Sequence, residues 1–329
     1  MDIDSRLRGR RVLVTGGAGF IGSNLIESLL EEGNYVVCLD NFSTGKRRNI
    51  EKFLDNPEFI LIEGDIRDVS ICREAVKGTD IVFHQAALGS VPRSIADPIS
   101  STDVNTGGFV KMIFTAKEAG VERFIYASSS SVYGNNTVLP KVEDKIGKPL
   151  SPYGVTKLSD ELFAEVFSTI YGIKVIGLRY FNVFGPRQDP EGAYAAVIPK
   201  FILQLMQHER PVINGDGTIS RDFTFIDNVI KANHLAAIVE KEEAFNQVYN
   251  IACGESTSLT RIFEIIRECL GRYDKDILGI EPLYGPERPG DIKHSLASIK
   301  KAEELIGYSP MTDVFEGLEK TVEWFVNNR

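Results

Sequence analysis

The chain has 329 residues, of which 43 % are hydrophobic and 25 % charged, an ordinary composition for a globular protein with one large or two moderate domains. The formal net charge of −9 disfavours nucleic acid as a partner, and no apolar run reaches the ~18 residues of a membrane span, so we expect neither a nucleic-acid nor a membrane partner. The four cysteines are scattered without a CxxC pair, which predicts no metal site, no disulfide framework and a cytoplasmic location.

Short apolar runs alternate with helical patterns in the first half of the chain. Buried strands are predicted at residues 11–15, 35–40, 59–63, 80–84, 123–127 and 174–178. Helices are predicted between most of them, including residues 24–32 and 107–119. Strands that alternate with helices predict a Rossmann-type, doubly wound parallel α/β sheet with helices on both faces.

The pattern changes after about residue 180, where Gly, Pro and polar turns become dense. Helices are predicted there at 199–207, 260–270 and 314–326. We therefore expect residues 1–180 to form the dinucleotide-binding domain, with 225–252 crossing back to it. Residues 181–224 and 253–329 would form a smaller mixed α/β substrate lobe over the strand ends, where open α/β sheets bind ligands.

A glycine-rich turn lies directly between the first strand and the first helix. Gly16, Gly19 and Gly22 permit a tight turn and a close backbone approach to a pyrophosphate, which the helix N-terminus would then bind. Asp40 ends the second strand, where a carboxylate can accept hydrogen bonds from both ribose hydroxyls and would repel a 2′-phosphate. These features predict NAD, rather than NADP, as the cofactor.

Serines 128–131 follow the fifth predicted strand, so their hydroxyls would project into the ligand crevice. Tyr153 and Lys157 are four residues apart and share one face of a helix that Pro152 begins. Ionising a free phenol at pH 7 costs about 4 kcal/mol, and a nearby ammonium lowers that cost. The pattern therefore predicts that Tyr153 takes a proton from a sugar hydroxyl, while Ser129 holds the same hydroxyl.

These residues together resemble the extended short-chain dehydrogenase/reductase family, and the likeness covers almost the whole chain. The nearest resemblance is to the bacterial UDP-N-acetylglucosamine 4-epimerase branch. It is carried by the segments HQAALGSVPRS (84–94), LPKVEDKIGKPLSPYG (139–154), LRYFNVFGPRQDPEGAYAAVIPKF (178–201), INGDGTISRDF (213–223) and YGPERPGDIKHSLASI (284–299).

The resemblance implies a role for each matching residue. The catalytic residues would be Ser129, Tyr153 and Lys157. Cofactor contacts are implied for Gly16, Gly19, Phe20, Ile21, Gly22, Asp40, Asn41, Ser43, Gly45, Asp65, Ile66, Gln85, Ala86, Ala87, Asn105, Tyr153, Lys157, Tyr180 and Val183. Substrate contacts are implied for Gly89, Ser90, Ser129, Ser131, Tyr153, Asn182, Gln188, Ala196, Val197, Arg221, Arg288, Asp291 and Ser295, with the two arginines on the UDP diphosphate.

The implied reaction is a redox-neutral inversion at carbon 4 of a UDP-N-acetylhexosamine, in a polysaccharide pathway. Family members restricted to plain hexoses carry a bulky tyrosine where this chain has Ser295, and serine leaves room for an acetamido group. A 4-epimerase of UDP-N-acetylhexosaminuronic acids remains the main alternative. A nucleotide-sugar 4,6-dehydratase or a decarboxylase is disfavoured because Ser130 and Ser131 stand where those enzymes need a carboxylate. A non-enzymatic dinucleotide sensor is disfavoured by the intact Ser129, Tyr153 and Lys157.

The resemblance also implies a homodimer with the commonest oligomer symmetry, in which the helix after Asn105 and the Tyr153 helix of each subunit form a four-helix interface. Apolar residues recur along residues 107–119, which suits burial against either a second subunit or the sheet.

Overall fold

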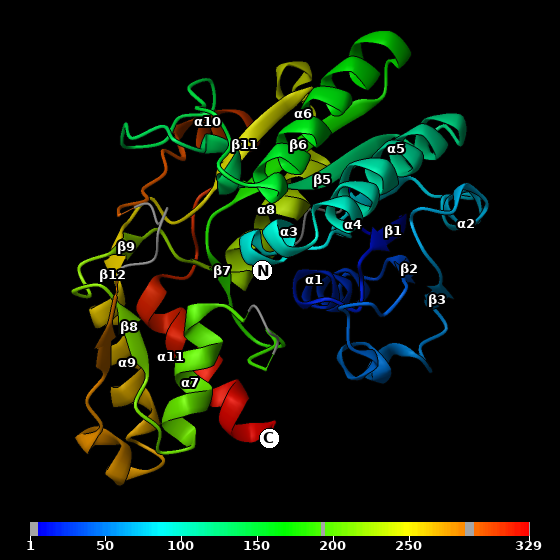
Figure 1. The fold of residues 1–329 in the computed structure, drawn as a ribbon. Coiled ribbons are helices and arrows are strands. Elements are labelled where there is room, and N and C mark those ends of the chain that lie inside the picture. Colours follow the sequence, from blue (N-terminus) through cyan, green and yellow to red (C-terminus); the bar gives the residue numbers. More distant parts are fainter. Residues whose placement is uncertain (1–5, 192–194, 287–292, 329) are drawn as a thin grey trace.

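The computed structural model describes residues 6–191, 195–286 and 293–328. Seven parallel strands form its central sheet in the order β11–β6–β5–β4–β1–β2–β3 (Figure 1). The strands are β1 (Arg11–Thr15), β2 (Tyr35–Asp40), β3 (Phe59–Glu63), β4 (Ile81–His84), β5 (Arg123–Ser129), β6 (Lys174–Tyr180) and β11 (Gln247–Ile251). The chain winds outward from β1 in both directions, which confirms the doubly wound fold and puts the strand-order switch between β1 and β4.

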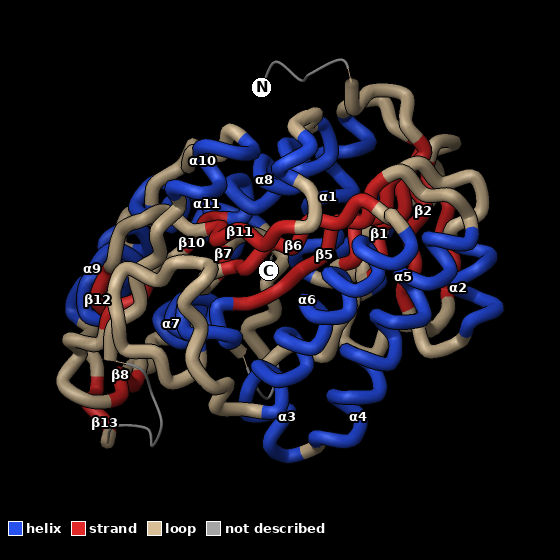
Figure 2. Tube along the Cα trace, turned by 90° about the horizontal axis from the view of Figure 1, so that it is seen from above, coloured by secondary structure: helices blue, strands red, loops and turns tan. Residues whose placement is uncertain are grey.

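Helices cover both faces of the sheet, as Figure 2 shows. One face carries α1 (Phe20–Glu31) and α8 (Ile226–Ile238), which contact each other, and the other carries α2 (Val69–Ala75), α5 (Gly108–Glu118) and α6 (Pro152–Tyr171). Successive side chains of β1 enter two different cores, since Val12 and Val14 pack with α1 while Leu13 packs with α5. A strand covered on both faces is apolar throughout, and this is why the strands read as continuous apolar runs.

Short elements lie in the connections between the longer strands and helices. They are α3 (Val91–Ala96), α4 (Pro98–Thr102), the π-helical turn η3 (Asp103–Gly107), and the 3-10 turns η1 (Arg47–Asn49), η2 (Glu51–Phe53), η4 (Ser130–Tyr133), η5 (Glu242–Ala244) and η6 (Lys275–Gly279). Among the described residues, no helix combines the length and the apolar character needed to cross a bilayer.

The later part of the chain builds a smaller mixed lobe from short two-stranded pairs and helices. Its elements are β7 (Val183–Phe184), α7 (Val197–Met206), β8 (Val212–Asn214), β9 (Ser220–Arg221), β10 (Thr224–Phe225), β12 (Thr257–Ser258), α9 (Leu259–Leu270), β13 (Leu283–Gly285) and α11 (Val314–Asn327). Helix α10 (Lys300–Ile306) instead packs against β11 at the edge of the central sheet. The pairs are β7 with β10, β8 with β13 and β9 with β12.

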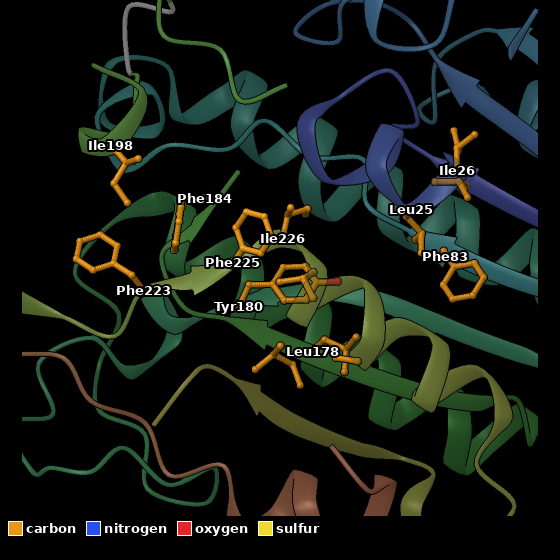
Figure 3. Close-up of a cluster of buried hydrophobic side chains, with 14 of the residues drawn as sticks. Leu25, Ile26, Phe83, Leu178, Tyr180, Phe184, Ile198, Phe223, Phe225 and Ile226 are labelled. Atoms are coloured by element: carbon orange, nitrogen blue, oxygen red, sulfur yellow. The ribbon is translucent and has the colours of Figure 1, made fainter. Parts of the chain in front are cut away.

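One hydrophobic core runs from the sheet into this lobe. Figure 3 shows Leu178 and Tyr180 of β6 in the same cluster as Phe184, Phe225 and Ile226. Each of these side chains is almost completely buried. The lobe is therefore packed onto the carboxyl ends of the strands by shared apolar side chains.

Candidate active site

The glycine loop after β1 has a geometry that side chains would obstruct. Gly16 has a φ of +68°, and a Cβ there would lie 2.8 Å from the Cα of Ala86. A Cβ on Gly22 would lie 2.2 Å from the carbonyl oxygen of Gly16. Helix α1 starts at Phe20, four residues before the predicted start. Glycine is unfavourable in helices, so the sequence pattern did not indicate this start, whereas in the structure the glycines allow the helix to follow the loop directly. No side chain caps this N-terminus, which leaves its amides facing the loop.

Asp40 lies beside the loop at the end of β2. Its Oδ2 accepts a hydrogen bond from Ala18 N at 2.9 Å, and its Oδ1 accepts one from Phe42 N at 2.8 Å. Burial raises the pKa of the Asp40 carboxyl, and the two backbone hydrogen bonds counteract that rise. Each carboxylate oxygen keeps acceptor capacity, so a ribose diol can bind here while a phosphate would be repelled.

A cavity of about 300 Å³ opens along the glycine loop. Among the residues for which the resemblance implies cofactor contacts, its lining includes Gly16, Gly19, Phe20, Ile21, Gly22, Asp40, Asn41, Ser43, Ile66, Gln85, Ala86 and Ala87. The sequence analysis missed Leu39, Thr44, Gly64, Leu88 and Val104, which also line it and carry no motif signal. A glycine cradle, a helix N-terminus and a buried carboxylate together fit a dinucleotide such as NAD.

Other implied cofactor residues lie around this cavity rather than in its lining. Gly45 packs against Asp40, where an added Cβ would lie 2.9 Å from Oδ1. The carboxylate of Asp65 is bound by Arg67 and Asn41, and the hydrogen bond from Arg67 lowers the pKa of Asp65 to about 2.

Tyr180 and Val183 lie where β6 leads into the smaller lobe. The Tyr180 hydroxyl donates to Gln85 Oε1 at 3.2 Å and accepts from Asn233 at 2.9 Å. The Val183 carbonyl oxygen accepts from Gln188 Nε2 at 3.1 Å. Burial raises the pKa of Tyr180 to about 12, so this phenol stays neutral and serves to hold Gln85 at the cavity.

Strand β5 continues two residues beyond its predicted end and therefore contains Ser128 and Ser129. Ser129 Oγ accepts a hydrogen bond from Ser131 N at 3.1 Å and donates to Ser131 Oγ at 3.2 Å. These bonds fix the hydroxyl of Ser129 at the carboxyl end of β5, where it caps the turn η4 that follows the strand.

Tyr153 lies in the first turn of α6. Ser151 caps this helix by accepting a hydrogen bond from Gly154 N at 3.1 Å, and Pro152 occupies the first turn, so the entry signal in the sequence is confirmed. Tyr153 N donates to Ser94 Oγ of α3 at 3.0 Å. The helix start is thus fixed both by its own cap and by the loop after β4.

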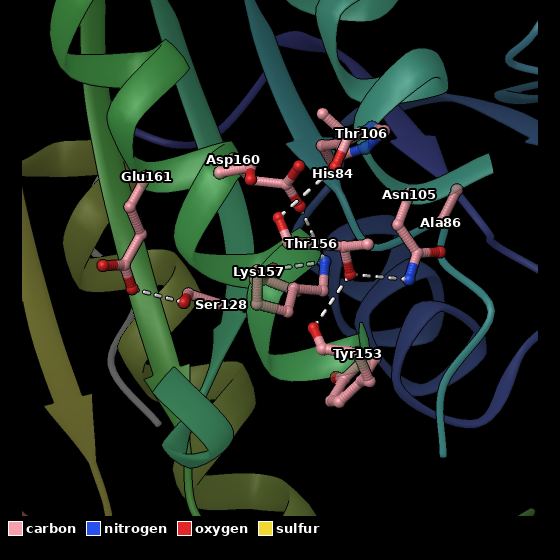
Figure 4. A network of polar contacts seen from close by, with 12 residues as sticks. His84, Ala86, Asn105, Thr106, Ser128, Tyr153, Thr156, Lys157, Asp160 and Glu161 are labelled. Atoms are coloured by element: carbon pink, nitrogen blue, oxygen red, sulfur yellow. Dashed lines mark hydrogen bonds and ion pairs between the residues drawn. The ribbon is translucent and has the colours of Figure 1, made fainter. Parts of the chain in front are cut away.

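Lys157 lies one turn further along α6 and is buried (Figure 4). Its Nζ donates to the carbonyl oxygen of Ala127 on β5 at 2.9 Å. It also forms an ion pair with Asp160 Oδ2 at 3.2 Å, a partner that the sequence analysis did not identify. The ammonium is therefore fixed between α6 and the end of β5, on the same helix face as Tyr153.

Asn105 connects the loop after β4 to α6. Its Oδ1 accepts from Leu88 N at 2.7 Å, and its Nδ2 donates to Thr156 Oγ1 at 3.1 Å (Figure 4). Asn105 lies in the π-helical turn η3, a local distortion that is frequent at functional sites. These hydrogen bonds place Asn105 between α6 and the loop after β4, where it holds the two together.

A buried ion pair joins α6 to β6, and the sequence analysis did not identify it either. Arg179 of β6 forms two 2.8 Å hydrogen bonds with the carboxylate of Glu161. Ser128 Oγ donates to the same carboxylate. The hydrogen bonds and charge of Glu161 raise the pKa of Arg179 despite its burial. No local sequence pattern relates Arg179 to Glu161, which lie 18 residues apart.

A second cavity lies between the loop after β4 and the smaller lobe. Among the implied substrate residues its lining includes Ser90, Asn182, Val197 and Arg221. Gly89 lines the first cavity and Ser90 the second, so the two cavities lie close to each other at this peptide. Ser90 and Asn182 have φ values of +95° and +36°, which are strained for side-chain-bearing residues and are often retained at ligand sites.

The lining of this second cavity also contains residues that the sequence analysis missed. They include Pro92, Lys200, Phe201, Gln204, Asn214 and Phe223. Gln204 Oε1 is buried and has no hydrogen-bond partner among the described residues. The predicted helix 199–207 located this segment, but its periodicity could not show which of its polar side chains face the cavity.

Ser295 lies next to Arg221, although 74 residues separate them in the sequence. Ser295 N donates to the carbonyl oxygen of Ser220 at 3.1 Å, and Ser220 precedes Arg221 in β9. Ala196 caps the start of α7, beside the cavity residue Val197. Arg288 and Asp291 lie outside the described residues.

Gln188 lines a neighbouring cavity rather than the one that Asn182 and Arg221 share. The residues around it there include Arg48, Lys52, Arg187 and Trp324. Its placement separates it from the other implied substrate contacts among the described residues.

Comparisons with known proteins agree with this geometry. Residues 12–252 match the NAD dependent epimerase/dehydratase family. A UDP-glucose 4-epimerase of Mycolicibacterium smegmatis is 35 % identical over 319 residues, which cover 96 % of this chain and 99 % of that protein. A UDP-N-acetylglucosamine 4-epimerase structure from Methanobrevibacter ruminantium M1, in complex with UDP-N-acetylmuramic acid, is 41 % identical with a TM-score of 0.90, over 98 % of this chain and 100 % of that one.

A UDP-glucuronic acid 4-epimerase structure from Bacillus cereus, in complex with UDP-glucuronic acid and NAD, is 33 % identical with a TM-score of 0.88, over 97 % of this chain and 100 % of that one. The matched segment includes the glycine loop, Asp40, Tyr153 and Lys157. The chain belongs to the NAD dependent epimerase/dehydratase family, among its UDP-sugar 4-epimerases.

Proposed function

We propose that the protein interconverts UDP-N-acetylglucosamine and UDP-N-acetylgalactosamine by inverting carbon 4 of the sugar. The observation that carries the proposal is the buried ammonium of Lys157, fixed one helical turn from Tyr153 and at the strand end that bears Ser129. This arrangement lies beside a cavity fit for NAD, and a second cavity with Arg221 adjoins it. The 41 % identical relative named for the same activity supports the choice of sugar.

The residues of this chain would divide the proton chemistry among them. The Lys157 ammonium stabilises Tyr153 as a phenolate, and this phenolate accepts the proton of the sugar 4-hydroxyl and becomes a neutral phenol. Ser129 holds the same hydroxyl through its Oγ. Bound NAD supplies the redox capacity for removing and returning hydride at that carbon. The other residues assigned to the cofactor and the substrate by resemblance hold the sugar carbon 4 next to the nicotinamide.

The acetamido preference rests on Ser295. Its backbone amide donates to the carbonyl oxygen of Ser220, and this bond brings residue 295 near Arg221 of the proposed diphosphate clamp. A 4-epimerase of UDP-N-acetylhexosaminuronic acids is the second candidate, and the 33 % identity to a UDP-glucuronic acid 4-epimerase supports it. The segment 127–134 contains no carboxylate, which argues against a dehydratase.

The direct test is a panel of separate incubations with UDP-N-acetylglucosamine, UDP-glucose and the 6-carboxylate form of each, followed by chromatographic resolution of the epimers. We expect the highest kcat/KM with the N-acetylated hexose. A higher value with a 6-carboxylate would replace the proposed substrate by the uronic acid.

We further propose that residues 1–180 with 225–252 bind NAD and that 181–224 with 253–329 bind the nucleotide sugar. A homodimer through α5 and α6 is proposed as well. It is supported by a row of half-exposed apolar side chains on α6, namely Val155, Leu162, Phe163, Val166 and Ile170. Free thiols at all four cysteines suit the cytoplasm, the location that we propose.

A further inference from the structure

Lys157 shares its buried position with a second charged group. Asp160 follows it by three residues on α6, and the two side chains are 3 % and 1 % exposed. The ammonium donates to Asp160 Oδ2 at 3.2 Å and to the Ala127 carbonyl oxygen at 2.9 Å. Because an ammonium has three protons, these contacts leave one for the Tyr153 and cofactor side of the site. The carboxylate is therefore a direct part of the electrostatic setting of Lys157.

The far side of Asp160 is poorly solvated. Its Oδ1 is buried without a short hydrogen bond among the described residues. The nearby Thr106 hydroxyl donates to the Thr156 carbonyl oxygen at 3.5 Å (Figure 4), and it counteracts the rise in the pKa of Asp160 less than Lys157 does. A buried carboxylate that lacks half of its hydrogen bonds is costly to keep ionised. Its charge consequently depends strongly on the ammonium beside it.

The neighbouring titratable groups add little to the stabilisation of the Asp160 carboxylate. Glu161 on α6 opposes its charge and is itself bound by Arg179 of β6. Tyr126 on β5 has its pKa raised by burial, and burial also lowers the pKa of His84 on β4 to about 3, so both are neutral near pH 7. Burial raises the pKa of Asp160 to about 7, and the attraction of Lys157 counteracts the rise.

The charge of Asp160 matters for catalysis because it opposes that of Lys157. A protonated Asp160 leaves the ammonium a full positive charge that favours the Tyr153 phenolate, whereas an ionised Asp160 makes the pair nearly neutral. We propose that Asp160 is a positioning residue that holds the Lys157 ammonium against β5 and limits how strongly that ammonium favours the Tyr153 phenolate. This inference rests on the proposed function for the role of Tyr153 as the base.

The test replaces Asp160 by Asn, which keeps the shape and an acceptor oxygen but removes the charge. We expect the acid limb of the kcat/KM profile to move to lower pH by on the order of one unit, because loss of the anion favours the phenolate. Glu122→Gln is the matched control: it removes a carboxylate from the exposed 3.4 Å pair with Arg10, at the opposite end of β5, and should leave the limb unchanged.

A second measurement follows phenol ionisation directly in the NAD-loaded protein, without sugar. The near-ultraviolet absorbance of each variant is titrated against pH, and subtraction of the matching Tyr153→Phe variant isolates residue 153 from the other tyrosines. We expect Asp160→Asn to ionise at lower pH than the wild type, and Asp160→Glu to remain close to it. Because no turnover is needed, the result stands even if the enzyme acts on a different sugar.

Asp160→Ala serves as a second neutral variant, and circular dichroism establishes that each variant is folded. If the folded neutral variants lose kcat while both the rate profile and the phenol titration keep the wild-type midpoint, Asp160 has only a packing role and the proposal is overturned.

Discussion

At the scale of single residues, chemistry that depends on sequence spacing was predictable. The glycines at 16, 19 and 22 and Asp40 were predicted from local pattern, and the structure gathers them at one cavity. Contacts such as that of Lys157 with the Ala127 carbonyl oxygen and that of Arg179 with Glu161 were not predictable, because they join residues that a local pattern does not relate. Gln188 illustrates the same limit, since its position in a loop did not indicate which cavity its side chain lines.

Ser295 allows a prediction at this scale. Ser295→Tyr would fill the volume assigned to the acetamido group, so we expect kcat/KM for UDP-N-acetylglucosamine to fall at least ~100-fold, about 2.7 kcal/mol of transition-state stabilisation. Turnover of UDP-glucose should change far less. Ser295→Ala, which removes only a hydroxyl, is the control and should retain both activities. Equal losses on both sugars would mean that residue 295 does not face the acetamido group.

At the scale of elements, the strands were predicted better than the helix starts. Three of the six predicted strands, β1, β2 and β3, have the predicted start and end. In β1 and β2 the apolar run marks the strand directly, because burial on both faces demands continuous apolar sequence. Strand β5 extends beyond its predicted end because Ser128 and Ser129 are polar and so end the apolar run. In the structure the Ser128 hydroxyl donates to Glu161 of α6, and that of Ser129 accepts from Ser131 N in the turn after the strand. The start of helix α1 was predicted too late, because its first turn includes Gly22, which helix propensity disfavours.

Helix α6 carries a prediction of its own. Its half-exposed apolar row includes Leu162, Val166 and Ile170, which recur at helical spacing and would be buried by the same face of a second copy. Light scattering should therefore give twice the chain mass of 36.5 kDa. Val166→Asp should shift the protein toward the single-chain mass, because a carboxylate is costly to bury in an apolar contact.

The matched control for α6 is Met311→Asp, which changes an equally exposed apolar residue outside that helix and should leave the mass unchanged. A single-chain mass for the wild type at micromolar concentration would contradict the proposed dimer.

At the scale of the whole molecule, the doubly wound sheet followed from the alternation of strand and helix patterns, and the family comparison agrees with it. The contact between the residues around 220 and 295 could not be derived from pattern alone, since it depends on how β9 and the segment after residue 293 pack together. The loop after β4 contributes Gly89 to the first cavity and Ser90 to the second, which places the proposed sugar site close to the proposed NAD site.

The most direct test of the central claim is the conversion of UDP-N-acetylglucosamine by the purified protein with no NAD added. We predict that the wild type forms UDP-N-acetylgalactosamine until the two epimers reach a constant ratio, and that Tyr153→Phe slows this by about 10²- to 10⁴-fold, as loss of a general base would. An unchanged rate in Tyr153→Phe, or no epimer from any UDP-sugar with the NAD-loaded wild type, would contradict the account.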